Sequence, residues 1–125
     1  MTEPEDGFTL IELLVTLAII GLLMSIVAPR YFPSVKRAEE TVLKQNLALL
    51  RDAIDKHHAD TGKYPGSLEE LAQKRYIRAV PLDPVAQSAS SWIVVPPQDL
   101  KTGAVYDVRS GAKGAARDGT DYEQW

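Results

Sequence analysis

The sequence has no cysteine among its 125 residues, so neither a disulfide framework nor a thiolate metal site is available to it. It also lacks a Gly-rich phosphate loop, a paired carboxylate cluster and a Ser/His/acid set, and we therefore do not expect an enzyme. The two histidines, His57 and His58, are adjacent. On a helix they would point about 100° apart and could not chelate one ion together, which predicts one helix-end cap and one solvated imidazole.

An excess of positive charge is missing as well. The chain has 14 basic and 17 acidic residues, a formal net charge of -3. Nucleic-acid binding depends on phosphate neutralisation by Lys and Arg, so nucleic acid is not an expected partner. The length allows one small soluble domain beside the apolar block near the start, which argues against a two-domain enzyme.

Residues 8–28 read FTLIELLVTLAIIGLLMSIVA, and Glu12 is their only charge. A helix of this length rises about 31 Å, close to the roughly 30 Å of a bilayer core. A core helix could hardly be enclosed by the remaining chain, and a secretory signal peptide would need a basic start and a later cleavage site. An ordinary single-pass anchor fits the length but gives no reason for a carboxylate in the apolar run.

Gly7, Phe8 and the following Thr-Leu-Ile-Glu12 resemble the class III signal of type IV pilins and type II secretion pseudopilins. The resemblance implies that a prepilin peptidase cleaves after Gly7 and methylates the new amine of Phe8. It further implies that the Glu12 carboxylate meets the Phe8 amine of a neighbouring subunit. Such a pair would remove two costly unpaired charges beside an apolar helix.

The resemblance implies a single-pass inner-membrane protein with its C-terminal domain in the periplasm, whereas the positive-inside rule alone would place Arg30, Lys36 and Arg37 in the cytoplasm. Removing the leader's three acidic residues leaves 17 − 3 = 14 acidic against 14 basic side chains. Proline lacks an amide donor, so we expect the helix to bend or melt at Pro29, where the family also has a proline, and to stop at Pro33.

Residues 34–60 carry apolar side chains at steps of three and four, which predicts an amphipathic helix ended by Gly62. We expect the charged side chains of this helix, including Glu40, to face solvent. We expect its apolar stripe to pack on a small sheet. The stripe comprises Val35, Ala38, Val42, Leu43, Leu47, Leu49, Leu50, Ala53 and Ile54. Ser67 and Glu70 form a capping box for a short helix reaching about Arg75.

Residues 91–95 and 104–108 are β-rich runs that predict an antiparallel hairpin, giving an α+β fold with the long helix on one face. The expected organisation is a leader at 1–7, a membrane and assembly helix at 8–29 and a periplasmic pilin-like domain at 30–125. The residues that extend the resemblance to G-type pseudopilins are Gly62, Tyr64, Pro65, Pro81, Asp83 and Pro84.

The tail, residues 109–125, is rich in Gly and Ala, so something must order it. G-type pseudopilins carry a calcium loop here, and Asp118 and Asp121 with carbonyls of residues 109–111 would supply hard oxygen ligands. The acidic run of the family is reduced in this chain. Turn-capping by the two aspartates is the other interpretation. Trp125 is expected to anchor the tail by burying its ring.

These features favour a structural subunit of a type II secretion pseudopilus. Its expected partners are copies of itself, other pseudopilins, inner-membrane assembly proteins, the prepilin peptidase and membrane lipid. A type IV pilin for adhesion or motility is the related alternative. A membrane-anchored periplasmic binding module is an alternative from another class, and it predicts an uncleaved bond between Gly7 and Phe8.

Overall fold

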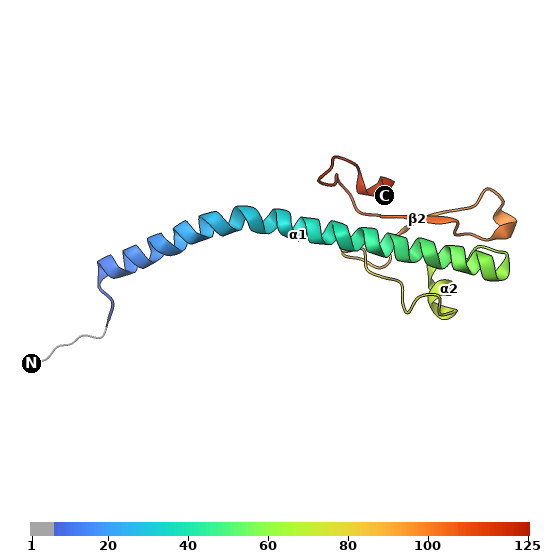
Figure 1. The fold of residues 1–125 in the computed structure, drawn as a ribbon, viewed down its shortest axis with the longest axis horizontal. Helices are drawn as coiled ribbons and strands as arrows, with labels where there is room; N and C mark the ends of the chain where they lie inside the picture. Colours follow the sequence, from blue (N-terminus) through green and yellow to red (C-terminus); the bar gives the residue numbers. More distant parts are fainter. Residues whose placement is uncertain (1–6) are drawn as a thin grey trace, which may run out of the picture. The chain divides into compact units, whose positions relative to one another are not determined.

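The computed structural model describes residues 7–125, which form two α-helices, two short strands and two 3-10 helices. Along the chain these are α1 (Leu10–Thr61), α2 (Leu68–Gln73), β1 (Ile93–Val95), η1 (Leu100–Thr102), β2 (Asp107–Arg109) and η2 (Tyr122–Gln124) (Figure 1). The chain divides into two compact units, one up to Lys36 and one from Arg37 to Trp125. Helix α1 contributes to both.

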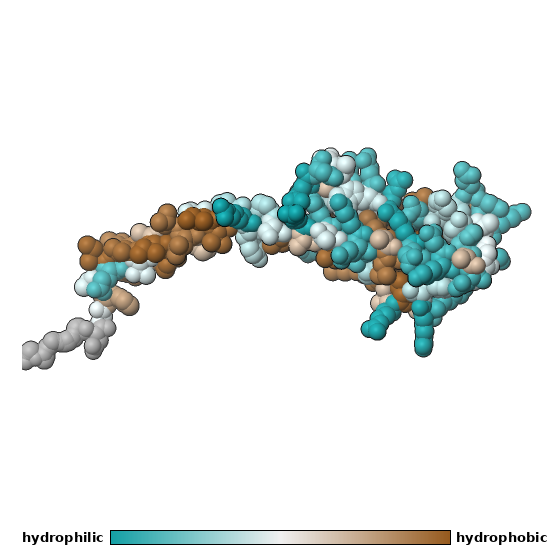
Figure 2. Space-filling view, in the orientation of Figure 1, coloured by the Kyte–Doolittle hydropathy of each residue, from teal (hydrophilic) through white to brown (hydrophobic). Residues whose placement is uncertain are grey.

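The first unit is an apolar helix whose side chains are exposed. Figure 2 shows these hydrophobic residues in brown, in contrast with the largely hydrophilic surface of the second unit. Phe8 is 84% exposed and Leu22 is 64% exposed. An 18-residue window of α1 has a mean hydropathy of 2.6 and none of it is buried, so the helix is long and apolar enough to cross a membrane by length and composition.

Helix α1 continues through both prolines of the first unit. Our expectation that Pro33 stops the helix is wrong, because α1 is helical through it. At Pro29 the helix is not melted in the isolated chain, and the bend expected there stays a prediction. Proline fits helical φ angles and removes one backbone hydrogen bond, so a long apolar helix can retain it at the cost of an unpaired carbonyl four residues earlier. These carbonyls belong to Ser25 and Pro29.

The core of the second unit lies against one face of α1. Buried side chains follow α1 at steps of three and four, from Leu43 through Leu47 and Leu50 to Ile54. Ala53 of α1 is also buried, and the rest of the core comes from residues on later segments, namely Leu68, Leu71, Ile77, Trp92, Val105, Val108, Ala112, Ala116 and Tyr122. Figure 1 shows α2, β2 and the tail gathered around this half of α1.

The predicted single stripe on α1 is wrong in part. Val35, Val42 and Leu49 are 38%, 42% and 45% exposed, so they lie off the buried face. Two residues that we did not place in the stripe lie on the buried face instead. Glu40, which we expected to face solvent, is 7% exposed, and His57, which we expected to cap the helix end or face solvent, is 2% exposed. The buried stripe therefore extends in both directions beyond its apolar members.

Strands β1 and β2 pair antiparallel, with Val94 opposite Val108. This confirms the α+β, pilin-like fold, although β2 begins at Asp107 rather than at residue 104. Helix α1 ends at Thr61, before Gly62, whose φ of 75° is a conformation that favours glycine. The capping box is also confirmed, since the Ser67 hydroxyl accepts a hydrogen bond from the Glu70 amide at 3.2 Å.

Candidate functional site

The first candidate site is the start of α1, where Thr9 and Glu12 cap the helix reciprocally. The Glu12 amide donates to Thr9 Oγ1 at 3.1 Å, and the Thr9 amide donates to Glu12 Oε2 at 3.3 Å. Both hydrogen bonds satisfy donors that a helix N-terminus leaves free. The Glu12 carboxylate thus has a partner within its own chain. The sequence contained this signal, since Thr9 precedes Glu12 by the three residues of a capping box, but we did not use it.

Gly7 and Phe8 precede this box in an open position. A Cβ atom added at Gly7 would meet no atom within 4 Å, and Phe8 is largely exposed. A peptidase could therefore approach the bond between them. Cleavage, methylation and the pairing of Phe8 with Glu12 remain predictions.

The second candidate site fixes the tail to α1 through Glu40. Glu40 Oε1 accepts hydrogen bonds from the Arg117 amide and from the Tyr122 hydroxyl, both at 2.9 Å. Glu40 Oε2 accepts one from Arg117 Nε at 3.1 Å, which is also an ion pair. We call Glu40, Arg117 and Tyr122 the Glu40 anchor.

Burial and hydrogen bonding act in opposite directions on the Glu40 carboxyl. Burial raises its pKa, but the hydrogen bonds from the Arg117 amide, the Tyr122 hydroxyl and the Arg117 guanidinium outweigh burial, so the pKa lies below its usual value. Burial, together with the hydrogen bond to Glu40, raises the pKa of Tyr122 to about 12. At neutral pH the anchor therefore joins a carboxylate to a neutral phenol.

Two cationic residues of α1, Arg51 and Lys44, contact Trp125 at the end of the tail. Arg51 donates through Nε to Asp107 at 3.0 Å and through Nη2 to the backbone oxygen of Val108 at 2.9 Å. Its Nη2 also donates to the backbone oxygen of Trp125. Lys44 Nζ lies 4.8 Å from the centre of the Trp125 ring. Trp125 packs against the core only in part, so its anchoring depends on these cations as well as on burial.

The contacts of Asp118 are those of a turn-capping residue. Its Oδ1 accepts from the Thr120 amide at 3.0 Å and from the Thr120 hydroxyl at 2.6 Å. These hydrogen bonds lower the pKa of Asp118, with the hydroxyl as the largest cause. Asp121 begins η2 and makes no side-chain capping bond. Within residues 7–125 no group of three His, Cys, Asp or Glu side chains is arranged to hold a metal ion.

A buried carboxylate also joins the 81–84 segment to the chain after β2. Asp83 is fully buried, and its Oδ1 accepts from the amides of Val85 and Ala86, both at 3.0 Å. Its Oδ2 accepts from the Ser110 hydroxyl at 2.5 Å. Next to Ser110, a Cβ atom on Gly111 would lie 1.8 Å from the Ser91 carbonyl oxygen, so this close approach requires glycine.

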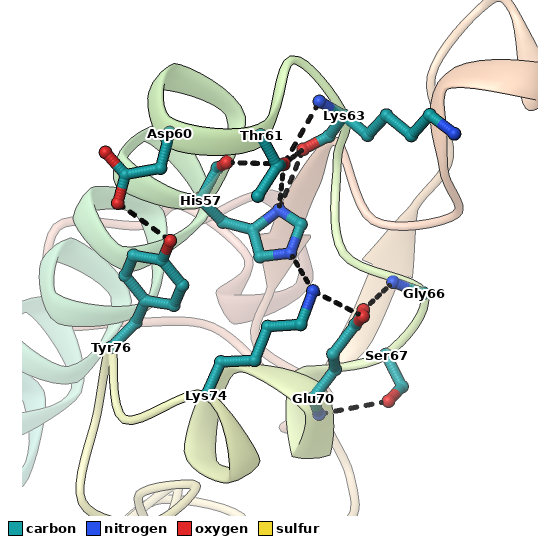
Figure 3. Close-up of polar contacts among 9 residues, drawn as sticks. All are labelled: His57, Asp60, Thr61, Lys63, Gly66, Ser67, Glu70, Lys74 and Tyr76. Atoms are coloured by element: carbon teal, nitrogen blue, oxygen red, sulfur yellow. Dashed lines mark hydrogen bonds and ion pairs between the residues drawn. The ribbon is translucent and has the colours of Figure 1, made fainter.

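His57 joins the end of α1 to α2, as Figure 3 shows. Its Nδ1 lies 2.7 Å from the Lys63 carbonyl oxygen, which can only accept, so Nδ1 carries the proton. Its Nε2 then accepts from Lys74 Nζ at 3.2 Å, and Lys74 also pairs with Glu70. His58 stacks on Tyr64 with 4.2 Å between ring centres. His57 is therefore the buried imidazole of the two, and His58 is half-buried against the Tyr64 ring.

The arrangement as a whole defines a class of protein. The segment Gly-Phe-Thr-Leu-Ile-Glu leads into an exposed apolar helix, and that helix continues into a small α+β domain. This is the architecture of a pilin-like subunit. Residues 4–28 match the family model described as the prokaryotic N-terminal methylation motif.

The comparison with curated proteins identifies the family more closely. The chain is 30% identical to the type II secretion system core protein G of Pseudomonas aeruginosa over 98 residues, which cover 66% of this chain and 69% of the relative. It is 27% identical to the core protein G of Vibrio cholerae over 139 aligned positions, covering 98% of this chain and 93% of that relative. No solved structure matches. The chain belongs to the family of the type II secretion system core protein G.

Proposed function

We propose that the chain is a pseudopilin, processed between Gly7 and Phe8, that polymerises through its apolar helix into the pseudopilus of a type II secretion system. The observation that carries this proposal is the exposed apolar helix, which begins at the methylation motif and holds one carboxylate, Glu12. The family is structural, so no catalytic residue is required. Assembly would bury the exposed side chains in lipid or against other copies.

The Thr9 and Glu12 capping box supports a definite order of events. Before cleavage there is no amine at Phe8, and Glu12 accepts from the amide of its own Thr9. Cleavage after Gly7 would create a cation one residue before Thr9. The Phe8 amine of a neighbouring copy would then give Glu12 a charged partner, which is stronger than the neutral amide. Polymerisation thus follows processing because only the processed chain offers that partner.

A pseudopilin of this kind would have several partners and one membrane orientation. The prepilin peptidase would cleave the chain, inner-membrane assembly proteins and other pseudopilins would incorporate it, and lipid would hold it before assembly. Its C-terminal domain would lie in the periplasm. A reporter fused after Trp125 tests the orientation, and activity of a cytoplasm-specific reporter would contradict it.

Mass spectrometry of the full chain co-expressed with a prepilin peptidase tests the processing step. We expect a mature chain that begins with N-methylated Phe8. An intact bond between Gly7 and Phe8 would contradict the proposal and would favour an anchored binding module instead.

A substitution of Glu12 tests the assembly step. Glu12→Leu should leave cleavage intact and reduce filament assembly about a hundredfold, because leaving one charge of a buried pair unpartnered costs about 3 kcal/mol. The control is Glu69→Leu, the same change at an exposed carboxylate on α2, and it should assemble normally. Equal assembly by the two variants would refute the role of Glu12.

A further inference from the structure

The tail of this domain is ordered although its composition disfavours order. Residues 109–125 contain three glycines, and glycine loses the most backbone freedom on folding. Even so, Ala116 and Tyr122 belong to the core. The resemblance to G-type pseudopilins implies a calcium ion as the source of order in this segment.

Three backbone oxygens of the tail turn accept hydrogen bonds from amides of the tail itself. The Thr120 carbonyl accepts from the Ala116 amide at 2.6 Å, and the Ala116 carbonyl accepts from the Gly119 amide at 3.0 Å. The Gly114 carbonyl accepts from the Tyr122 amide at 3.2 Å. These hydrogen bonds close the turn without a ligand, whereas calcium requires six to eight oxygen atoms directed at one point.

The charges of the tail do not favour a divalent cation either. Residues 109–125 contain three basic and three acidic side chains, so their net charge is 3 − 3 = 0. Glu123 is paired with Lys113 at 2.7 Å, and Oδ1 of Asp118 accepts two hydrogen bonds from Thr120. Calcium sites gain affinity from an excess of carboxylates, which this segment does not have.

The Glu40 anchor holds the turn of the tail against α1. The Glu40 side chain is 9% exposed and all three of its hydrogen-bond donors belong to the tail. Two of the donors come from one residue, Arg117, through its amide and its guanidinium. The anchor therefore fixes both the backbone and the side chain of the turn at a single carboxylate.

We propose that the Glu40 anchor replaces a bound calcium ion as the device that orders residues 113–125. Of the two residues expected to hold calcium, Asp118 then caps a turn through Thr120, and Asp121 lies in extended backbone directly before η2. The folded tail of this chain is consequently independent of divalent cations. Processing and assembly can fail or succeed without affecting this proposal.

Hydrogen–deuterium exchange of the full chain in detergent micelles tests it, with the tail amides of residues 114–125 as the readout. For the unmodified chain, excess chelator should leave tail exchange unchanged, and millimolar calcium should not slow it. Glu40→Gln should accelerate tail exchange at least tenfold, with or without calcium, because its NH₂ group cannot accept from Arg117 and its neutral oxygen is a weaker acceptor for the remaining donors. The matched control is Glu39→Gln, the same change at the neighbouring residue, which should exchange like the unmodified chain.

Two results would overturn the proposal. One is faster tail exchange on chelation that added calcium reverses. The other is equal tail exchange in Glu40→Gln and Glu39→Gln. If Glu40→Gln loosens the whole domain, as judged by exchange of α1 amides 43–57, the milder Tyr122→Phe variant replaces it. That variant removes one hydrogen bond and should accelerate tail exchange alone, and unchanged exchange would count against the anchor.

Discussion

Replacing Asp83 by alanine should lower the free energy of unfolding of this domain more than the same replacement of an exposed aspartate. Asp83 is fully buried and accepts from three donors, the amides of Val85 and Ala86 and the hydroxyl of Ser110. A buried donor left without a partner costs about 1–3 kcal/mol. The Ser110 hydroxyl is buried and the two amides are part-buried, so we expect a loss of about 3 kcal/mol of unfolding free energy, a large share of the 5–15 kcal/mol typical of a domain.

The asparagine variant makes the prediction quantitative. Asp83→Asn keeps an oxygen for the two amides and places an NH₂ group opposite Ser110, whose hydroxyl then has no acceptor. We expect a loss of about 1–2 kcal/mol, well below that of the alanine variant. Urea unfolding of the full chain in detergent measures both values. Trp92 is a suitable probe because its indole donates to the Pro81 carbonyl at 2.9 Å, close to the substitution.

The matched control is Asp99→Ala. Asp99 is an exposed aspartate that accepts one hydrogen bond, from the Lys101 amide at 3.0 Å, as the cap of η1. Its loss should cost about 1 kcal/mol or less. If Asp83→Ala and Asp99→Ala destabilise the domain equally, the reasoning from burial and donor count is refuted.

The remaining predictions concern close packing, pH and helix capping. Gly111→Ala should lower the midpoint of thermal unfolding by several degrees, since its Cβ would collide with the Ser91 carbonyl, and an unchanged midpoint would refute the close approach. Glu40 has a lowered pKa in the folded chain, so its contribution is complete above the unfolded value of 4.5 and is lost as the pH falls through the folded pKa. The difference in thermal stability between the unmodified chain and Glu40→Gln should therefore shrink from pH 6 to pH 3, and a constant difference would contradict this. Ser67→Ala should cost about 1 kcal/mol by removing the cap of α2, as urea unfolding can measure, whereas Ser90→Ala on the surface should be neutral.

Local patterns predicted the elements of this fold well. Gly62 and the Ser67 box marked helix ends through local backbone chemistry, and the alternation of β-rich and turn-forming residues located the hairpin to within a few residues. The apolar run and its single carboxylate indicated the family. Each of these signals is contained in a short stretch of chain, where neighbouring residues determine the outcome.

The polar contacts that fix the tail could not be predicted in the same way. Glu40 and Arg117 are 77 residues apart, and only the folded chain brings them together. One signal was nevertheless present, because residues 40, 43, 47, 50, 54 and 57 follow one another at steps of three and four. Glu40 and His57 therefore occupy positions of the buried helix face, although their side chains are polar. A polar residue at a core position of a helix is thus a reason to expect a partner from elsewhere in the chain.

The two prolines inside α1 have a mechanical consequence. The Ser25 and Pro29 carbonyls would pair with the amides of residues 29 and 33, and proline has no amide hydrogen at either position. Extending residues 25–33 therefore breaks fewer backbone hydrogen bonds than extending the same length of α1 before or after them. Over residues 25–33, extension from 1.5 Å to about 3.3 Å per residue would add about 16 Å. A filament built on α1 would therefore contain, in every subunit, a short link that lengthens under tension before the rest of the helix does.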